Sequence, residues 1–138
     1  MLRKSKKIVS LPTVKNNASN LHRAVYEFCR RRFPLFTILQ EYTIFVDDRG
    51  MKEHLFVDIF IKELNLAIEC NGEQHYKANK FFFSGSFEFK KAQKRDSLKS
   101  EWCKKNKIAL AVFKYSDKLS YEFFNETIDN AIKEIYNE

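Results

Sequence analysis

The apolar residues of this chain follow two different periods, and each period predicts a type of secondary structure. From Leu21 the apolar positions recur every three or four residues, which predicts a first helix. That helix should end at Phe33, because a residue that precedes proline disfavours the α conformation. We expect a long helix over 87–106 and a last helix over 116–136, opened by a polar cap at its first residues.

Alternating or continuous apolar runs predict four strands. The run "EYTIFV" (41–46) precedes a turn, "DDRG", and a short loop joins "HLFVDIFI" (54–61) to "LNLAIEC" (64–70). The run "IALAVFKY" (108–115) is nearly all apolar, as in a strand covered on both faces. The order helix, three strands, helix, strand, helix predicts an α/β fold. Its mixed sheet would combine an antiparallel meander with one crossover strand and would be flanked by helices.

Length and composition favour one globular domain. The chain has 138 residues, with 14 Phe and 6 Tyr for a core and only 3 Gly and 2 Pro. Residues 1–17 are interpreted as a basic arm and residues 18–138 as the domain. No apolar run reaches the roughly 18 residues that span a bilayer, and the start of the chain lacks the features of a signal peptide. We therefore expect no membrane partner.

The cysteine pattern indicates a reducing compartment. Cys29, Cys70 and Cys103 are odd in number and far apart, and no CxxC pair suggests zinc. The simplest interpretation is reduced thiols in a cytoplasmic protein.

The excess of positive charge lies in two segments. The formal net charge is +7, from 25 Lys and Arg against 18 Asp and Glu. The first segment is the arm and the second covers 90–107. Clustered positive charge favours binding to the phosphate backbone of nucleic acids. Charge alone, however, speaks for and against nucleic-acid binding equally. The candidate contacts are Arg3, Lys4, Lys6, Lys7, Lys91, Lys94 and Arg95.

Two carboxylates stand inside the most strand-like segments. Alternation along 54–61 points Asp58 away from the face that Val57 and Ile59 share. A hairpin loop centred between residues 63 and 64 would place Asp58 directly across from Glu69, with Cβ atoms about 4.5–5.5 Å apart.

Two facing carboxylates stay ionised only when positive charge lies between them. Mg²⁺ meets this need, since it binds one or two carboxylates together with water and substrate phosphate. The alternative is a pair of edge-strand acids in solvent, or one acid paired with Lys or Arg.

Four quoted segments carry a resemblance to a known family. They are "SNLHRAVYEFCRRRFP", "VDIFI", "IECNGEQHY" and "RDSLKSEWCKKNKIAL", which together span about residues 19–115. In this order and spacing the chain resembles the PD-(D/E)XK nuclease superfamily, with the restriction-endonuclease-like fold. Within it, the chain is similar to small enzymes related to very-short-patch-repair endonucleases, including phage-encoded members.

The resemblance implies a metal site. Asp58 and Glu69 would hold one or two Mg²⁺ ions, for which Mn²⁺ substitutes, and the carbonyl of Cys70 would be a third ligand. In that superfamily the metal turns water into a nucleophile and stabilises charge on the scissile phosphate.

The chain departs from the family at one position. The lysine expected two residues after Glu69 is Asn71, and an amide supplies neither positive charge nor a base. The resemblance offers Gln74 and His75, which match a "QH" of relatives, or Lys99, less readily Arg95, reaching in from the next helix. These residues are the candidates for contact with the phosphate or for positioning water.

Three further segments carry open interpretations. His22 occupies the position where relatives often carry a Glu that faces the metal, so it would bind metal or orient water; a surface histidine is the alternative, and Glu27 is a second candidate on that helix. Leu98 and Trp102 favour core packing over base stacking, and the same holds for the Phe residues of "FFFSGSF".

The sequence therefore predicts a Mg²⁺-dependent DNA endonuclease that nicks or cuts both strands, as a monomer or homodimer. RNA and branched DNA stay open as substrates. One alternative is an inactive relative that only binds nucleic acid. Another is a phage accessory protein that binds a protein partner. If the chain is phage-encoded, we expect it in the host cytoplasm.

Overall fold

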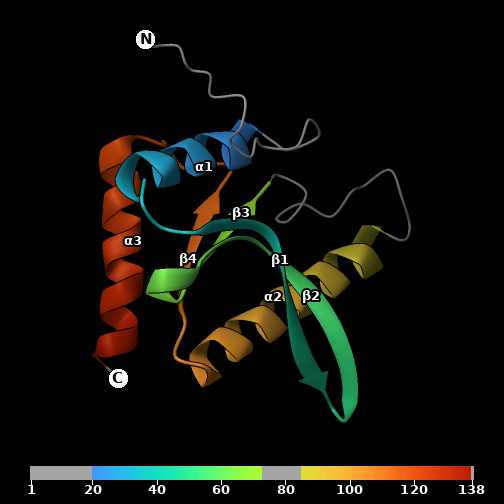
Figure 1. The fold of residues 1–138 in the computed structure, drawn as a ribbon. Coiled ribbons are helices and arrows are strands. Elements are labelled where there is room, and N and C mark those ends of the chain that lie inside the picture. The colour runs from blue at the N-terminus through green and yellow to red at the C-terminus, as the bar shows by residue number, and fades with distance from the viewer. Residues whose placement is uncertain (1–19, 73–84, 138) are drawn as a thin grey trace.

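The structure, a computed structural model, describes residues 20–72 and 85–137. The basic arm and the three Phe of "FFFSGSF" that precede Ser84 lie outside the described residues. Figure 1 shows the elements in chain order, which are α1 (Asn20–Arg32), β1 (Ile38–Asp48), β2 (Met51–Ile61), a 3-10 turn (Lys62–Leu64), β3 (Leu66–Asn71), α2 (Gly85–Lys105), β4 (Ala109–Lys114) and α3 (Tyr121–Tyr136).

The four strands form one mixed sheet in the order β1-β2-β3-β4. The pairs β1–β2 and β2–β3 are antiparallel, whereas β3 and β4 are parallel. The chain between β3 and β4 includes α2, as a parallel connection requires. The predicted fold class, a mixed α/β sheet flanked by helices, is confirmed.

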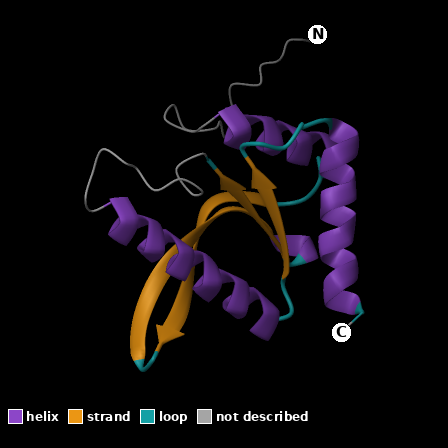
Figure 2. Cartoon of the chain, turned by 180° about the vertical axis from the view of Figure 1, so that it is seen from behind, coloured by secondary structure: helices purple, strands orange, loops and turns teal. Residues whose placement is uncertain are grey.

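The helices cover the two faces of the sheet unequally. Helices α1 and α3 pack on one face and α2 crosses the other, as the two opposite views show (Figures 1 and 2). In the two described stretches, every helix is too short or too polar to span a bilayer.

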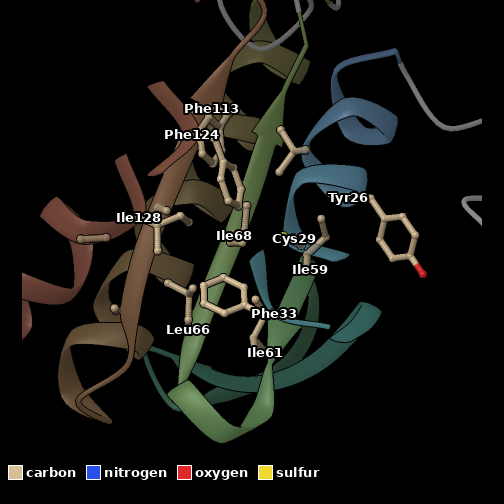
Figure 3. Packing of buried hydrophobic residues seen from close by; sticks show 14 residues of the cluster. Tyr26, Cys29, Phe33, Ile59, Ile61, Leu66, Ile68, Phe113, Phe124 and Ile128 are labelled. Atoms are coloured by element: carbon tan, nitrogen blue, oxygen red, sulfur yellow. The ribbon is translucent and has the colours of Figure 1, made fainter. Parts of the chain in front are cut away.

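The larger core cluster lies between the sheet and helices α1 and α3 (Figure 3). Phe113 of β4 stacks on Phe124 of α3 with ring centroids 5.6 Å apart. Ile59, Ile68 and Ile128 are fully buried beside them. Each such side chain contributes about 1.5–3 kcal/mol by leaving water, so this cluster fixes the middle of β3 firmly.

The second cluster lies under α2. It joins Val57, Phe60 and Ala67 of the sheet to Cys103 of α2. Leu98 and Trp102 pack against it as partly buried side chains, so the core packing expected for these two residues is confirmed.

Strict alternation along β2 fails at Asp58. Val57 belongs to the cluster under α2, whereas Ile59 belongs to the cluster under α1 and α3. The prediction that these two residues share a face is therefore wrong. The strand bends here, and its curvature is visible in Figure 1.

Strand β1 is also distorted next to this bend. The pairs Gln40–Ile59 and Tyr42–Val57 flank Glu41, whose φ of 51° lies in the left-handed region. A residue with a Cβ atom adopts this conformation at a cost of about 1–2 kcal/mol. The packing of both clusters offsets that cost and holds the bend beside Asp58.

Three predicted boundaries are corrected. Strand β1 starts at Ile38 and β2 at Met51, so a two-residue turn at 49–50 joins them. Both turn residues have positive φ, which matches the twist of a hairpin. Helix α3 starts at Tyr121 rather than near residue 116, because Asp117 closes the turn after β4 by accepting a bond from the Lys114 amide at 2.8 Å.

Candidate metal centre

The register between β2 and β3 positions the two acids. The paired residues are Ile59–Ile68, Phe60–Ala67 and Ile61–Leu66. The loop between the strands, 62–65, is centred between residues 63 and 64, and Asn65 takes a left-handed conformation with φ of 49°. The predicted register is confirmed for these pairs, and Asp58 and Glu69 lie directly beyond the Ile59–Ile68 pair, on the side away from the loop.

Each carboxylate accepts a main-chain hydrogen bond from the strand that carries the other. The amide of Asp58 donates to Oε2 of Glu69 at 3.0 Å. The amide of Cys70 donates to Oδ2 of Asp58 at 2.7 Å. Because the donors are main-chain groups of a sheet, both carboxylates are held in fixed positions without a metal.

The two strands separate beyond this point. Glu69 and Cys70 pair in parallel with Val112 and Phe113 of β4. The two acids therefore stand where β3 leaves β2 and continues beside β4. Side-chain to main-chain bonds connect β2 and β3 here, which leaves the second oxygen of each carboxylate for other partners.

A lysine from α2 completes the group. Nζ of Lys99 lies 2.9 Å from Oε1 of Glu69. Their side chains are only 14% and 6% exposed, so water screens this ion pair weakly. Lys99 supplies positive charge next to two carboxylates that would otherwise repel each other.

Burial has the largest effect on the pKa of Glu69. Burial, and after it the charge of Asp58, raises the pKa of this carboxyl, and the net pKa is about 7. Lys99 and the Asp58 amide act in the opposite direction. Glu69 therefore exchanges its proton near neutral pH, and added positive charge at the site would ionise it fully.

Cys70 contributes through its main chain. Burial, together with the charges of Asp58 and Glu69, raises the pKa of the thiol far above its usual range. The thiol stays protonated and is a poor metal ligand. The carbonyl of Cys70 as a third metal ligand stays a prediction.

The donor set fits a hard divalent cation. Within residues 20–72 and 85–137 no group of three or more His, Cys, Asp or Glu side chains can hold a metal. Asp58 and Glu69 would thus act as a two-carboxylate site. Mg²⁺ is commonly bound in this way, with water and substrate phosphate at its remaining positions.

The other predicted site residues lie in different places. His22 is a half-buried residue of α1, on the face of the sheet opposite α2, and its role stays a prediction. Asn71 is buried at the end of β3, where its carbonyl accepts the Tyr115 amide at 2.9 Å. Gln74 and His75 lie outside the described residues.

The basic candidates divide into three groups. Lys91 and Arg95 are exposed on α2, and the Lys91 ammonium lies 5.3 Å from the ring centroid of Phe87. Lys94 is paired with Asp48 at 2.8 Å, a contact between distant segments that no local pattern indicates. The remaining candidates, Arg3, Lys4, Lys6 and Lys7, lie outside the described residues.

Comparison with known proteins finds similarity to two viral proteins. Uncharacterized protein 033L of Invertebrate iridescent virus 3 is 37% identical over 67 residues, which are 49% of this chain and 34% of that protein. Uncharacterized protein 307L of Invertebrate iridescent virus 6 is 35% identical over 65 residues, which are 47% of this chain and 33% of that protein. The aligned part thus covers about a third of each relative. No family model matches the chain, and no solved structure matches it.

Proposed function

We propose that this chain is a Mg²⁺-dependent endonuclease that hydrolyses phosphodiester bonds in DNA and belongs to the PD-(D/E)XK superfamily. One observation carries the proposal. Asp58 and Glu69 are held side by side by main-chain amides, at the point where two strands separate, with Lys99 beside them. A structural ion pair needs only one acid, whereas a rigidly held pair of acids can supply two carboxylate ligands to a Mg²⁺ ion.

The metal would be held by Asp58, Glu69 and the carbonyl of Cys70. When bound, Mg²⁺ or Mn²⁺ supplies a polarised water and stabilises the negative charge that builds up on the phosphate. The protein residues provide the fixed geometry. Because the amides of Asp58 and Cys70 already hold the carboxylates, the site needs little reorganisation to bind a cation.

Lys99 takes the place of the family lysine that Asn71 cannot supply. Its ammonium group already lies within hydrogen-bonding distance of Glu69. A cation on a flexible four-carbon stem can release one anion and contact another, here a phosphate oxygen of the substrate. We assign Lys99 this role in preference to Arg95, which is exposed on the same helix.

The DNA backbone would follow the basic surface of α2. Lys91 and Arg95 are exposed there and available to phosphates. Lys94 is held by Asp48, so we expect it to contribute less. The arm with Arg3, Lys4, Lys6 and Lys7 would add contacts that do not depend on DNA sequence. A viral source is supported by the two viral relatives.

A second candidate function has its own support. The ion pair between Lys99 and Glu69 compensates the charge of the site without a metal. An inactive relative that binds nucleic acid would retain such a pair, so this alternative predicts DNA binding without cleavage.

Nicking of supercoiled plasmid tests the proposal. The protein would be assayed in Mg²⁺, in Mn²⁺ and in EDTA, beside Asp58→Asn and Glu69→Gln. Both amides keep an oxygen that accepts the main-chain hydrogen bond, so the fold is conserved while the charge is lost. Glu53→Gln changes an exposed acid of the same strand as Asp58 and is the matched control.

Metal-dependent nicking that both site variants lose and the control keeps would support the nuclease. Nicking that survives both substitutions would reject the site. DNA binding without nicking in any metal, on plasmid, branched and single-stranded substrates, would favour the second candidate.

A further inference from the structure

Strand β1 stands at an edge of the sheet. In the order β1-β2-β3-β4, it has a neighbouring strand on one side only. Its run "YTIFV" (42–46) consists of residues that favour strands. Edge strands are often guarded by lysine or proline, because an open edge pairs readily with another strand. This run contains neither residue, so the edge of β1 is suited to accept a partner strand.

The turn of the hairpin determines which main-chain groups face this edge. Asp48 and Met51 flank the two-residue turn, and residues in that position exchange main-chain hydrogen bonds. Bonded and non-bonded pairs alternate along an antiparallel ladder, so Thr43, Phe45 and Asp47 belong to non-bonded pairs. Their N–H and C=O groups therefore point away from β2, towards the open edge.

The same three residues direct their side chains to the face of the hairpin turned away from α2. Ile44 and Val46, which alternate with them, belong to the cluster under α2. Phe45 is 73% exposed, and its ring centroid lies 6.5 Å from that of His54 on β2. The ring of Phe56, which is 50% exposed, follows at 6.0 Å from His54. A row of exposed rings therefore borders the open edge.

The opposite edge of the sheet, β4, is flanked by helices. Leu110 and Val112 line a cavity of about 240 Å³ whose other walls belong mainly to α2 and α3. The Lys114 amide donates to the carboxylate of Asp117, which closes the end of this strand. By contrast, the tip of the β1–β2 hairpin lies away from α1 and α3 in both views (Figures 1 and 2). Of the two edges, β1 is the one more open to another strand.

A second copy of the chain fits the edge of β1. The regular part of this edge runs from Tyr42 to Asp48, between the left-handed residue Glu41 and the turn at 49–50. Its middle residue is Phe45. An antiparallel pair of β1 strands with a two-fold axis at Phe45 uses the whole stretch, and each open N–H meets an open C=O. The two Phe45 side chains become cross-strand neighbours, with Cβ atoms about 4.5–5.5 Å apart.

The charges of the edge favour a second copy over nucleic acid. Residues 42–48 contain two acids and no Lys or Arg, so a phosphate backbone would meet no cation there. Asp47 accepts a hydrogen bond from the Gly50 amide at 2.7 Å. Asp48 pairs with Lys94 at 2.8 Å, so both acids have partners within the chain. In this register the two Asp47 residues stand about 13 Å apart, farther than the Debye length of about 8 Å at physiological salt.

We propose that the chain forms a two-fold dimer in which the β1 strands of two copies pair edge to edge, with Phe45 opposite Phe45 of the partner subunit. The two sheets then form one continuous sheet. Because a single strand of each copy takes part, we expect a weak and reversible dimer. The dimer itself does not depend on the metal centre. Its consequence for catalysis rests on the proposed nuclease function, since a dimer carries one metal centre for each strand of a DNA duplex.

Sedimentation equilibrium of the full chain in EDTA tests the dimer. We expect the average mass to rise from one chain towards two as the protein concentration increases. Phe45→Lys places two ammonium groups opposite each other and should keep the mass at one chain. Phe56→Lys makes the same change on the same face, but on β2 and away from the edge, so it should preserve the dimer. Both replaced side chains are exposed, so circular dichroism should show an unchanged fold.

A disulfide tests the register. In the proposed pairing, Phe45→Cys places two thiols opposite each other, within the Cα separation that a disulfide bridges. Thr43→Cys is the matched control, because its two thiols would stand about 13 Å apart. Oxidised glutathione accepts the two electrons that the thiols release when they join. We expect at least fivefold more covalent dimer from Phe45→Cys than from Thr43→Cys or from the parent.

A mass of one chain at every concentration would overturn the inference, and so would particles larger than two chains. Equal crosslinking of the two cysteine variants would reject the axis at Phe45. A constant mass of one chain, together with weaker plasmid binding by Phe45→Ala, would assign the exposed rings to nucleic acid instead. None of the mass measurements involves cleavage, so failure of the nuclease proposal would leave the dimer intact, and failure of the dimer would leave metal-dependent nicking intact.

Discussion

Nζ of Lys99 lies 2.9 Å from Oε1 of Glu69, and this ion pair connects α2 to β3 beneath the surface of the protein. The two side chains are nearly buried, so water screens their attraction only weakly. A metal ion at Glu69 would compete with Lys99 for the same oxygen atoms. The behaviour of the site therefore depends on which cation Glu69 holds.

Removal of the lysine charge should destabilise the fold. Lys99→Met keeps the length of the side chain but leaves Glu69 facing Asp58 without compensation. We expect a loss of about 3 kcal/mol in the free energy of unfolding at pH 8, because breaking a buried pair strands one charge. Urea denaturation measures this loss.

Lys94→Met is the matched control for that prediction, because Lys94 pairs with Asp48 and its side chain is 47% exposed. Its effect should be much smaller, since solvent screens exposed pairs. Equal losses of unfolding free energy in the two variants would show that the Lys99–Glu69 pair stabilises the fold no more than the Lys94–Asp48 pair does.

Stability should fall as pH rises towards neutrality, because of Glu69. Its pKa in the folded chain is about 7, above the ordinary value of 4.5 for this carboxyl. A raised carboxyl pKa means that the folded state binds the proton more tightly. Its contribution is therefore complete below pH 4.5 and is lost as pH rises through 7.

Glu69→Gln should remove this pH dependence. Between pH 4.5 and pH 8 the free energy of unfolding of the parent should fall relative to the variant by on the order of 3 kcal/mol. The measurement is a series of urea titrations on both proteins. Parallel curves across this pH range would contradict the raised pKa.

Metal affinity should follow the opposite trend with pH. A carboxylate binds a cation only when it is deprotonated, so protons compete with the metal for Glu69. Below pH 7 the dissociation constant for Mn²⁺ should rise by about tenfold for each pH unit, as measured by calorimetric titration. Metal binding that is constant from pH 5.5 to pH 8 would exclude Glu69 as a ligand.

The position of the functional lysine can be tested by moving it. Residues 69 and 71 of a strand point to the same face, so a lysine at 71 would lie on the side of Glu69. Lys99→Met should reduce nicking by about a hundredfold or more, as expected when a group that stabilises charge is lost. Adding Asn71→Lys should restore part of the activity. Asn71→Gln in the same background, which adds length without charge, should restore none.

The register of the site could be predicted because it depends on local patterns. The two apolar runs place Asp58 and Glu69 within strands, and the polar loop at 62–65 fixes which residues face each other. Both signals lie within a short stretch of sequence, and both proved sufficient.

The bend at Asp58 could not be predicted in the same way. It requires Glu41 to take a left-handed conformation, and no glycine or asparagine marks that position. Packing on opposite faces decides it, since Val57 fits the cluster under α2 and Ile59 fits the cluster under α1. Helical spacing also allowed Lys99 to pair with Asp96, and only the tertiary position of α2 brings it to Glu69.

The sequence separations within the site have a consequence for the order of folding. Asp58 and Glu69 are 11 residues apart, whereas Lys99 is 30 residues from Glu69 and comes from a helix beyond a long connection. Closing a short loop costs less chain entropy and is faster than closing a long one. We infer that the two acids meet in a nascent hairpin before α2 docks. During that interval their mutual repulsion is uncompensated by the protein, and a divalent cation from the surroundings would stabilise the hairpin while the rest of the chain folds.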